Sequence, residues 1–241
     1  MARGFSQIVA ALLVLLATAQ TPPPNANYAG LQGLIIVGQH QDIAGTQKGV
    51  GVGPLLQVRG GGSRMKLSLE GIPVVGIPNV PPSATYGQAT PHLGIFNGQL
   101  EYAADRNGSF WVGLGETVYN QKTPLPAQQQ VVSSRLAGVR YALRYVHATS
   151  ATHVIEGFFG TAPLLTGSDV YIATGGALVE TKPERASEID ASLSFGYVHR
   201  STEWLIGLRT LNFAAKFINT GEAADRNVGL GPLIEWRHLF R

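Results

Sequence analysis

Cysteine is absent from the 241-residue chain, and charge and long apolar runs are scarce. Without cysteine no disulfide can form, so a disulfide-stapled fold is excluded. Charged residues make up 14% of the chain, the formal net charge is only +3, and lysine and arginine form no block, so nucleic acid is not an expected partner. Helix signals are weak, and beyond the N-terminus no apolar run approaches the length of about 18 residues that a membrane-spanning helix needs.

The first twenty residues, MARGFSQIVAALLVLLATAQ, differ from the rest of the chain. Arg3 lies in a short charged start, an apolar run covers Ile8–Ala17, and Ala17-Thr18-Ala19 has the small-x-small form of a cleavage site. These features predict a secretory signal peptide over residues 1–19, with a buried N-terminal helix as the alternative. The remaining residues, 20–241, have a normal length for one all-β domain.

Alternation of apolar and polar residues with a period of two is the main signal in that domain. In residues 186–199, for example, Ile189, Leu193 and Phe195 share one face, while Glu188 and Asp190 share the other. Each such segment therefore has one apolar and one polar face. The pattern predicts ten strands, at residues 28–40, 48–59, 63–72, 92–104, 109–119, 134–146, 152–162, 186–199, 202–217 and 227–240.

Short and long connections alternate along these strands. The second, fourth, sixth and eighth strands are followed by the tight turns GGGS, DRNG, HATSA and RS. An up-and-down barrel that inserts from one side of a membrane has short turns on one side and long loops on the other. Within the fourth long connection, the run VYIATGGALVE predicts a hairpin that extends beyond the barrel. The long connections are expected at residues 41–47, 73–91, 120–133, 163–185 and 218–226.

Aromatic residues of the apolar face gather at strand ends beside the short turns or at the C-terminus. Amphipathic rings are favoured at a membrane interface, so this arrangement indicates an aromatic girdle. Core aromatics that lie near turns are the alternative, but a soluble core places its aromatics in mid-strand. The apolar face should then contact lipid. The expected girdle consists of Tyr102, Phe110, Tyr145, Tyr197, Trp204, Trp236 and Phe240.

With these features the chain resembles the bacterial outer-membrane β-barrel proteins, either small OmpA/OmpW-like or porin-like barrels. The end GLGPLIEWRHLFR carries the resemblance further, because Trp236, His238 and Phe240 follow the alternating terminal pattern of that family, although Arg241 follows the last aromatic. The resemblance implies an all-β, up-and-down antiparallel transmembrane barrel of about ten strands, with eight or twelve as alternatives. It also implies a bacterial outer-membrane location, contact with outer-membrane lipid, and assembly by the barrel-insertion machinery through the C-terminal strand.

The polar face should line the barrel interior. In the hairpin of residues 134–162, a five-residue turn would pair Ala142 with Glu156 and place Glu156 between Arg140 and Arg144. Because both signs of charge are present, we interpret this face as a network of ion pairs that fills a narrow lumen, with the lining of a small solute path as the alternative. The expected lumen residues are Arg64, Lys66, Glu70, Glu101, Arg140, Arg144, Glu156, Glu188, Asp190, Arg209, Glu235 and Arg237.

Signals for catalysis or metal binding are weak. His199 and Ser201 form a His-x-Ser pair in a tight turn without a convincing acidic partner. His147 and His153 are too few ligands for a metal, and no cofactor is expected. The sequence therefore predicts a non-enzymatic outer-membrane barrel with a structural or surface-interacting role, or a narrow solute channel. A lipid hydrolase and a soluble barrel that binds a hydrophobic ligand inside are the alternatives, and neither a solute nor a surface partner can be named.

Overall fold

The computed structural model describes residues 26–42, 45–78, 92–125, 129–172, 177–217 and 225–240, so the expected signal peptide lies outside the described residues. No helix in this part of the chain is long and apolar enough to cross a membrane. The regular elements are β1 (Asn27–Asp42), β2 (Gly45–Gly61), β3 (Met65–Pro78), β4 (His92–Ala103), β5 (Phe110–Leu125), β6 (Gln130–Ala148), β7 (His153–Ala162), β8 (Thr166–Ile172), β9 (Leu178–Thr181), β10 (Pro183–His199), β11 (Thr202–Phe217) and β12 (Asp225–Phe240).

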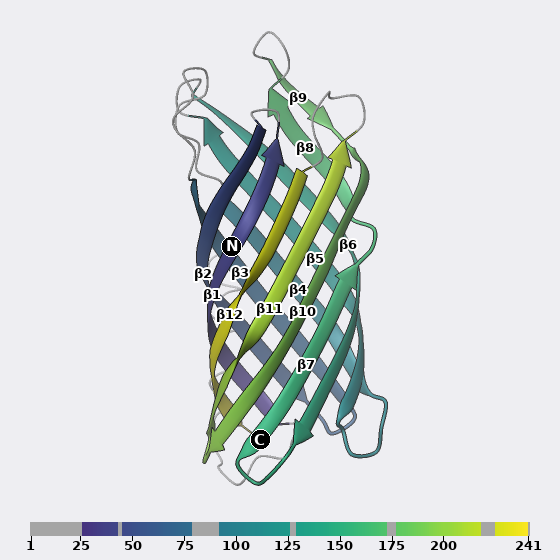
Figure 1. The fold of residues 1–241 in the computed structure, drawn as a ribbon. Coiled ribbons are helices and arrows are strands. Elements are labelled where there is room, and N and C mark those ends of the chain that lie inside the picture. The colour runs from purple at the N-terminus through teal and green to yellow at the C-terminus, as the bar shows by residue number, and fades with distance from the viewer. Residues whose placement is uncertain are drawn as a thin grey trace, which may run out of the picture.

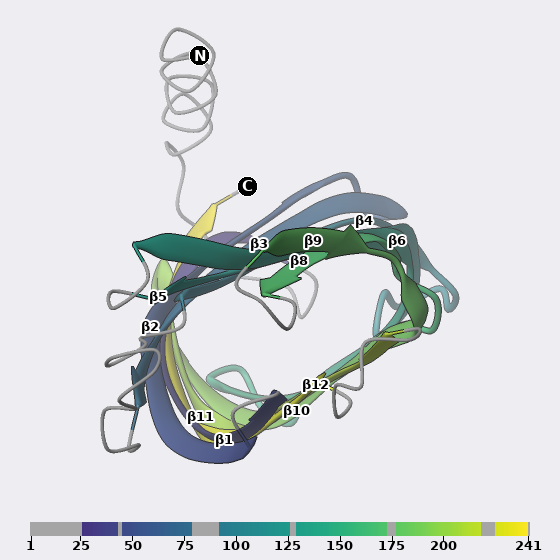
Figure 2. The same cartoon turned by 90° about the horizontal axis from the view of Figure 1, so that it is seen from above.

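Ten of these strands close into an antiparallel barrel, which confirms the predicted architecture (Figures 1 and 2). The order around the barrel follows the chain from β1 to β7 and continues through β10, β11 and β12. The first and last strands close the ring, because Asn27 pairs with Phe240 at one end of the β1–β12 ladder. Closure leaves no open edge in the ring, and this is the condition for placing a sheet in hydrocarbon.

The two remaining strands, β8 and β9, form the expected hairpin above the barrel (Figure 1). The β7–β10 ladder ends at Ala162 opposite Glu188. A separate ladder, between β8 and β9, includes Asp169 opposite Thr181. Between these points β8 pairs with β6 instead. Gly167 permits this rearrangement, because its φ is 152° and a Cβ at this position would collide with the backbone of β6.

The strands are longer on the hairpin side of the barrel than the sequence pattern indicates. The β1–β2 ladder extends to Asp42 opposite Gly45, and the β5–β6 ladder extends to Leu125 opposite Gln130. The long loops expected at residues 41–47 and 120–133 are therefore wrong, since most of these residues are paired in strands. Alternation of apolar and polar residues fades in these segments, and the pattern could not detect pairing there.

The turn between β6 and β7 also shifts the predicted register. Glu156 lies opposite Val146 rather than Ala142. The cause is hydrogen bonding within the turn: Ser150 Oγ accepts from the backbone amides of Thr152 at 3.2 Å and His153 at 3.1 Å. These side-chain bonds centre the turn closer to β7 than a count of residues suggests.

The outward face of the barrel is apolar. Exposed side chains along β10 and β11 include Leu193, Phe195, Ile206 and Leu208, and other strands continue the same belt. In a soluble protein, a contiguous apolar surface of this extent would be a liability. The outward position of this belt contradicts the alternative of a soluble barrel with its apolar face turned inward, and contact of the belt with lipid stays a prediction.

The aromatic girdle lies at the short-turn edge of this belt. Tyr197, Trp204 and Trp236 are directly opposite one another on β10, β11 and β12. These three rings are exposed, as are Tyr102, Phe110 and Tyr145. Phe240 is the exception, because its side chain is only 7% exposed at the rim where β12 ends opposite the start of β1. Position parity alone could not foresee that this rim position is covered.

Candidate functional site

The barrel interior is the candidate site, and it collects most of the charged residues that the sequence assigned to the lumen. Arg64 is a correction: it is exposed in the turn before β3, where its Nη1 donates to the backbone carbonyl of Asp105 at 3.2 Å. Alternation of faces holds only within a strand, and Arg64 lies just outside one. Glu70 is half-buried, and the buried members are Lys66, Glu101, Arg140, Arg144, Glu156, Glu188, Asp190, Arg209, Glu235 and Arg237.

A first group of ion pairs lies toward the short turns. Arg144 on β6 donates from Nη1 to Glu156 Oε1 at 2.5 Å and from Nη2 to Glu101 Oε1 at 3.2 Å. Glu101 Oε2 also accepts from Arg59 Nε at 2.7 Å. Arg144 therefore joins β6 to both β4 and β7. We call this group the lower ion cluster, and it comprises Arg59, Glu101, Arg144, Glu156, Glu203, Glu235 and Arg237.

Arg237 is the second centre of the lower ion cluster. It forms a bidentate pair with Glu156, in which Nη1 and Nη2 lie 2.7 and 3.0 Å from the two carboxylate oxygens. Its Nε also donates to Glu235 Oε1 at 2.5 Å, and Nη1 donates to Glu203 Oε2 at 3.2 Å. Bidentate pairs between ionised groups are the strongest hydrogen bonds that side chains form. The sequence reasoning did not include Arg59 and Glu203, although both have inward parity.

A second group of ion pairs, the upper ion cluster, comprises Glu70, Arg140, Glu188, Asp190 and Arg209. Arg140 Nη1 donates to Glu188 Oε1 at 2.9 Å, and its Nη2 donates to Asp190 Oδ2 at 3.0 Å. Arg209 forms a bidentate pair with Asp190 at 2.9 and 2.6 Å and also contacts Glu70. Glu156 thus pairs with Arg144, as the sequence suggested, whereas Arg140 pairs with carboxylates of β10.

The two clusters form one polar layer across the lumen. Arg140 Nε donates to Gln99 Oε1 at 3.3 Å, and Gln99 Nε2 in turn donates to Glu101 Oε1 at 2.8 Å. Arg144 Nη1 also lies 3.3 Å from the hydroxyl of Tyr28 on β1. Since β1 and β6 are five strands apart in either direction around the ring, this contact spans the full width of the barrel.

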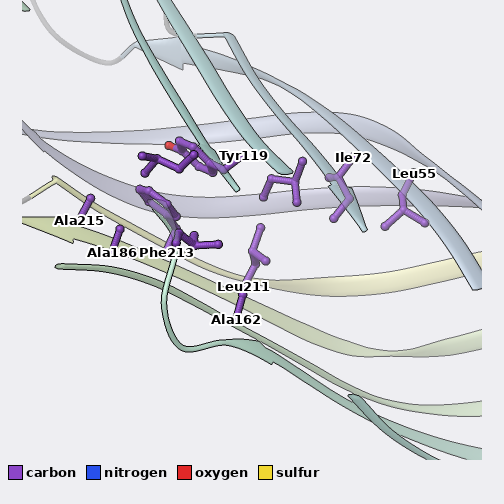
Figure 3. Packing of buried hydrophobic residues seen from close by; sticks show 11 residues of the cluster. Leu55, Ile72, Tyr119, Ala162, Ala186, Leu211, Phe213 and Ala215 are labelled. Carbon is purple, nitrogen blue, oxygen red and sulfur yellow. The ribbon is translucent and has the colours of Figure 1, made fainter. Parts of the chain in front are cut away.

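An apolar layer fills the interior on the hairpin side of the ion clusters (Figure 3). Its centre is a stacked pair in which the rings of Tyr119 on β5 and Phe213 on β11 lie 3.7 Å apart and within 3° of parallel. The layer was missed at the sequence level, although members such as Leu211 and Phe213 share inward parity with a charged residue of their own strand, Arg209. It consists of Leu55, Ile72, Ile95, Tyr119, Leu136, Ala162, Leu165, Ala186, Leu211, Phe213 and Ala215.

Aromatic rings also cover the guanidinium groups of the lower ion cluster. Arg59 lies over Trp111 at 4.4 Å from the ring centroid, and Arg237 lies over Tyr28 at 4.0 Å. Phe158 on β7 faces Arg144 at 4.9 Å. These cation–π contacts add favourable electrostatics and fill space that water would otherwise occupy.

A small recess opens from the short-turn end toward the lower ion cluster. Its volume is about 40 Å³, and Tyr28, Arg59, Glu156, Glu203 and Arg237 lie among its lining residues. A buried water needs roughly 10–15 Å³ of such volume, so the recess has room for a few water molecules. The recess ends at residues that are joined to one another across the barrel. It is therefore a shallow entrance to the lumen and not a channel through it.

The candidate histidines of the sequence lie beside the short turns and not in the barrel interior. No group of three or more histidine and carboxylate side chains there could hold a metal. In the turn RS, Thr202 Oγ1 donates to the backbone carbonyl of His199, and no hydrogen bond joins His199 to Ser201. His153 Nδ1 lies 3.0 Å from the hydroxyls of Ser150 and Thr152, but these contacts hold the turn itself.

Comparison with known proteins places the fold among bacterial outer-membrane barrels. The outer-membrane protease OmpT from Escherichia coli has a TM-score of 0.59 at 11% identity, covering 93% of this chain and 99% of that chain. The beta domain of the Bordetella autotransporter BrkA has a TM-score of 0.43 at 13% identity, covering 90% and 100%. The Pseudomonas putida toluene transporter TodX has a TM-score of 0.37 at 9% identity, covering 92% and 93%. No protein-family model matches the chain, and no curated protein matches it in sequence.

At 11% identity, the similarity to OmpT concerns the fold alone. That fold, the apolar outer belt and the aromatic edge of the belt all agree with the resemblance inferred from the sequence. The chain therefore has the architecture of an outer-membrane β-barrel, with an apolar belt on its outward face.

Proposed function

We propose that this barrel is a sealed, non-enzymatic membrane anchor that holds a surface hairpin and loops on the outer side of the bacterial outer membrane. The contact between Arg144 and Tyr28 carries the proposal, because it joins opposite walls of the barrel. The Tyr119–Phe213 stack joins β5 to β11 in the same way on the hairpin side. A solute would have to displace both layers in order to cross.

The outer side supplies the parts that could act on a surface partner. The β8–β9 hairpin stands above the ring, and its residues Leu178 and Val179 are exposed. Short turns lie on the periplasmic side of barrels of this kind, so the hairpin should face the exterior of the cell. Loops and projections on a rigid scaffold are where binding functions concentrate.

Planar-bilayer recording tests the sealed interior. The purified wild-type barrel should conduct ions poorly, because ion pairs and apolar side chains fill the lumen. Large and steady conductance steps from the wild-type protein would contradict the proposal and indicate an open channel. A heat-modifiability assay on the same sample should show that the protein is folded, so that weak conductance is not mistaken for failed insertion.

Cysteine labelling tests which end faces the exterior, and the chain is suited to it because it has no cysteine. Leu178→Cys on the hairpin should react with a membrane-impermeant maleimide in intact cells. Ser150→Cys in the β6–β7 turn is the matched control, since it is also exposed but lies at the opposite end. It should react only after the outer membrane is permeabilised. The reverse pattern would invert the proposed orientation.

A further inference from the structure

The rim formed by the short turns has an unusual charge. Three of the four short turns contain an arginine, namely Arg64, Arg106 and Arg200, and all three side chains are exposed. Asp105 is the sole acidic residue in these turns, all of which lie in the described part of the chain. It accepts a hydrogen bond from the backbone amide of Phe110 at 2.8 Å, and this bond lowers the pKa of the Asp105 carboxyl. Three arginines against one ionised aspartate leave these turns with an excess of positive charge.

Histidines extend this basic rim into the aromatic girdle. The ring centroids of His147 and Tyr145 lie 6.1 Å apart, and those of His153 and Tyr197 lie 5.5 Å apart. His199 is exposed beside Arg200 at the end of β10. Side chains that donate hydrogen bonds thus lie directly beside rings that prefer the boundary between water and lipid.

The opposite rim carries acidic side chains as well as basic ones. There, Lys216 and Glu184 form an ion pair at 2.9 Å. Glu116 and Glu180 are also exposed on that half of the barrel. The short-turn arginines have no acidic side chain paired with them in the described residues. Their charge is therefore available to a ligand.

Arg200 provides a second, independent observation. It is the first residue of the two-residue turn that joins β10 to β11, and its φ is 55°. Glycine is favoured at such a position, because a side chain with positive φ is strained. A strained position that holds a long cation rather than glycine suggests that the guanidinium serves a purpose other than forming the turn.

We propose that the short-turn rim binds anionic phospholipid headgroups of the periplasmic leaflet, of the phosphatidylglycerol type. The arginines would contact the phosphate groups, and the neighbouring aromatic rings would lie at the level of the glycerol backbone. Basic residues close to a membrane surface attract anionic lipid within roughly one Debye length. The inference rests on the proposed orientation but does not depend on whether the lumen is sealed.

Native mass spectrometry and vesicle reconstitution of the full mature barrel test this site. The probe is phosphatidylglycerol mixed with phosphatidylcholine, and the measured quantity is the amount of each lipid retained. The variant Arg64→Gln/Arg106→Gln/Arg200→Gly should lose preference for the anionic lipid by about five-fold for each removed charge at low salt. The matched control removes three exposed cations from the other rim, as Lys122→Gln/Arg135→Gln/Lys216→Gln, and should retain the preference.

Equal retention of phosphatidylglycerol by the wild type and the short-turn variant would overturn the proposal. Equal loss in the control variant would also overturn it, since the attraction would then belong to the whole surface. The single variant Arg200→Gly guards the test against misfolding. Glycine relieves the strain of the positive φ, so the urea midpoint should rise. Retention of the anionic lipid should nevertheless fall. The bilayer conductance of these variants should not change, so failure here is distinguishable from failure of the sealed-barrel proposal.

Discussion

The two halves of the barrel interior are closed by opposite kinds of chemistry. Toward the short turns, arginines and carboxylates fill the lumen, and toward the hairpin, Tyr119, Phe213 and aliphatic side chains fill it. The wall is continuous through both halves, and several strands change the character of their inward residues along their length. On β11, for example, Arg209 is followed on the same face by Leu211 and Phe213. One sheet can therefore carry two separate layers of side chains that close the lumen, one polar and one apolar.

The difference between the halves shows what each seal contributes. Buried ions cost free energy to desolvate, and their attraction repays this only when every partner is in place, so the ion clusters favour one specific arrangement more than they add stability. Apolar side chains have no such requirement and stabilise in proportion to the area they remove from water. We therefore expect stability to depend mainly on the apolar layer and resistance to ions mainly on the ion clusters.

Phe213→Ala should have the largest effect on stability. It removes the stack with Tyr119 and leaves a cavity in the apolar layer, which typically costs about 3–5 kcal/mol. Urea unfolding of the folded barrel in detergent measures the loss. Leu208→Ala, on the same strand but facing outward, is the control and should cost much less. A large rise in the bilayer conductance of Phe213→Ala would contradict the division of roles between the two layers.

Glu156→Gln should have a smaller effect on stability and a larger one on conductance. It leaves Arg144 and Arg237 without the carboxylate that they share, at a cost of about 1–3 kcal/mol. The lumen also becomes more positive, so the conductance that appears should favour anions. Bilayer recording under a salt gradient measures this selectivity. An unchanged, ion-tight barrel after this substitution would show that the apolar layer alone seals the lumen.

The sequence could predict the barrel because alternation is a local property. Leu193 and Asp190 fall on opposite faces by parity alone, and parity was sufficient for the lipid face, the ring of ten strands and most of the charged interior. The signal for the apolar layer was also present, since Leu211 and Phe213 share parity with Arg209. It was overlooked because a polar lumen was expected along the whole strand.

Other features depend on contacts that parity does not contain. The turn between β6 and β7 is set by hydrogen bonds to Ser150, so the register of Glu156 could not be counted from turn length. The pairing of Arg140 with Glu188 and Asp190 depends on the β7–β10 ladder as well as on its own hairpin. Arg59 belongs to the lower ion cluster through Glu101 on β4, two strands away from its own strand.

The smallest expected effect is the coupling free energy between the apolar layer and the ion clusters. Phe213 and Glu156 have no common partner among the described residues, because Glu156 pairs with Arg144 and Arg237, whereas Phe213 stacks on Tyr119. Effects of residues without shared partners usually add to within about 0.5 kcal/mol. The double variant Phe213→Ala/Glu156→Gln should therefore lose the sum of the two single losses in the same urea assay. A coupling well above this limit would mean that the polar and apolar layers form one cooperative plug, since loosening either layer would then already have loosened the other.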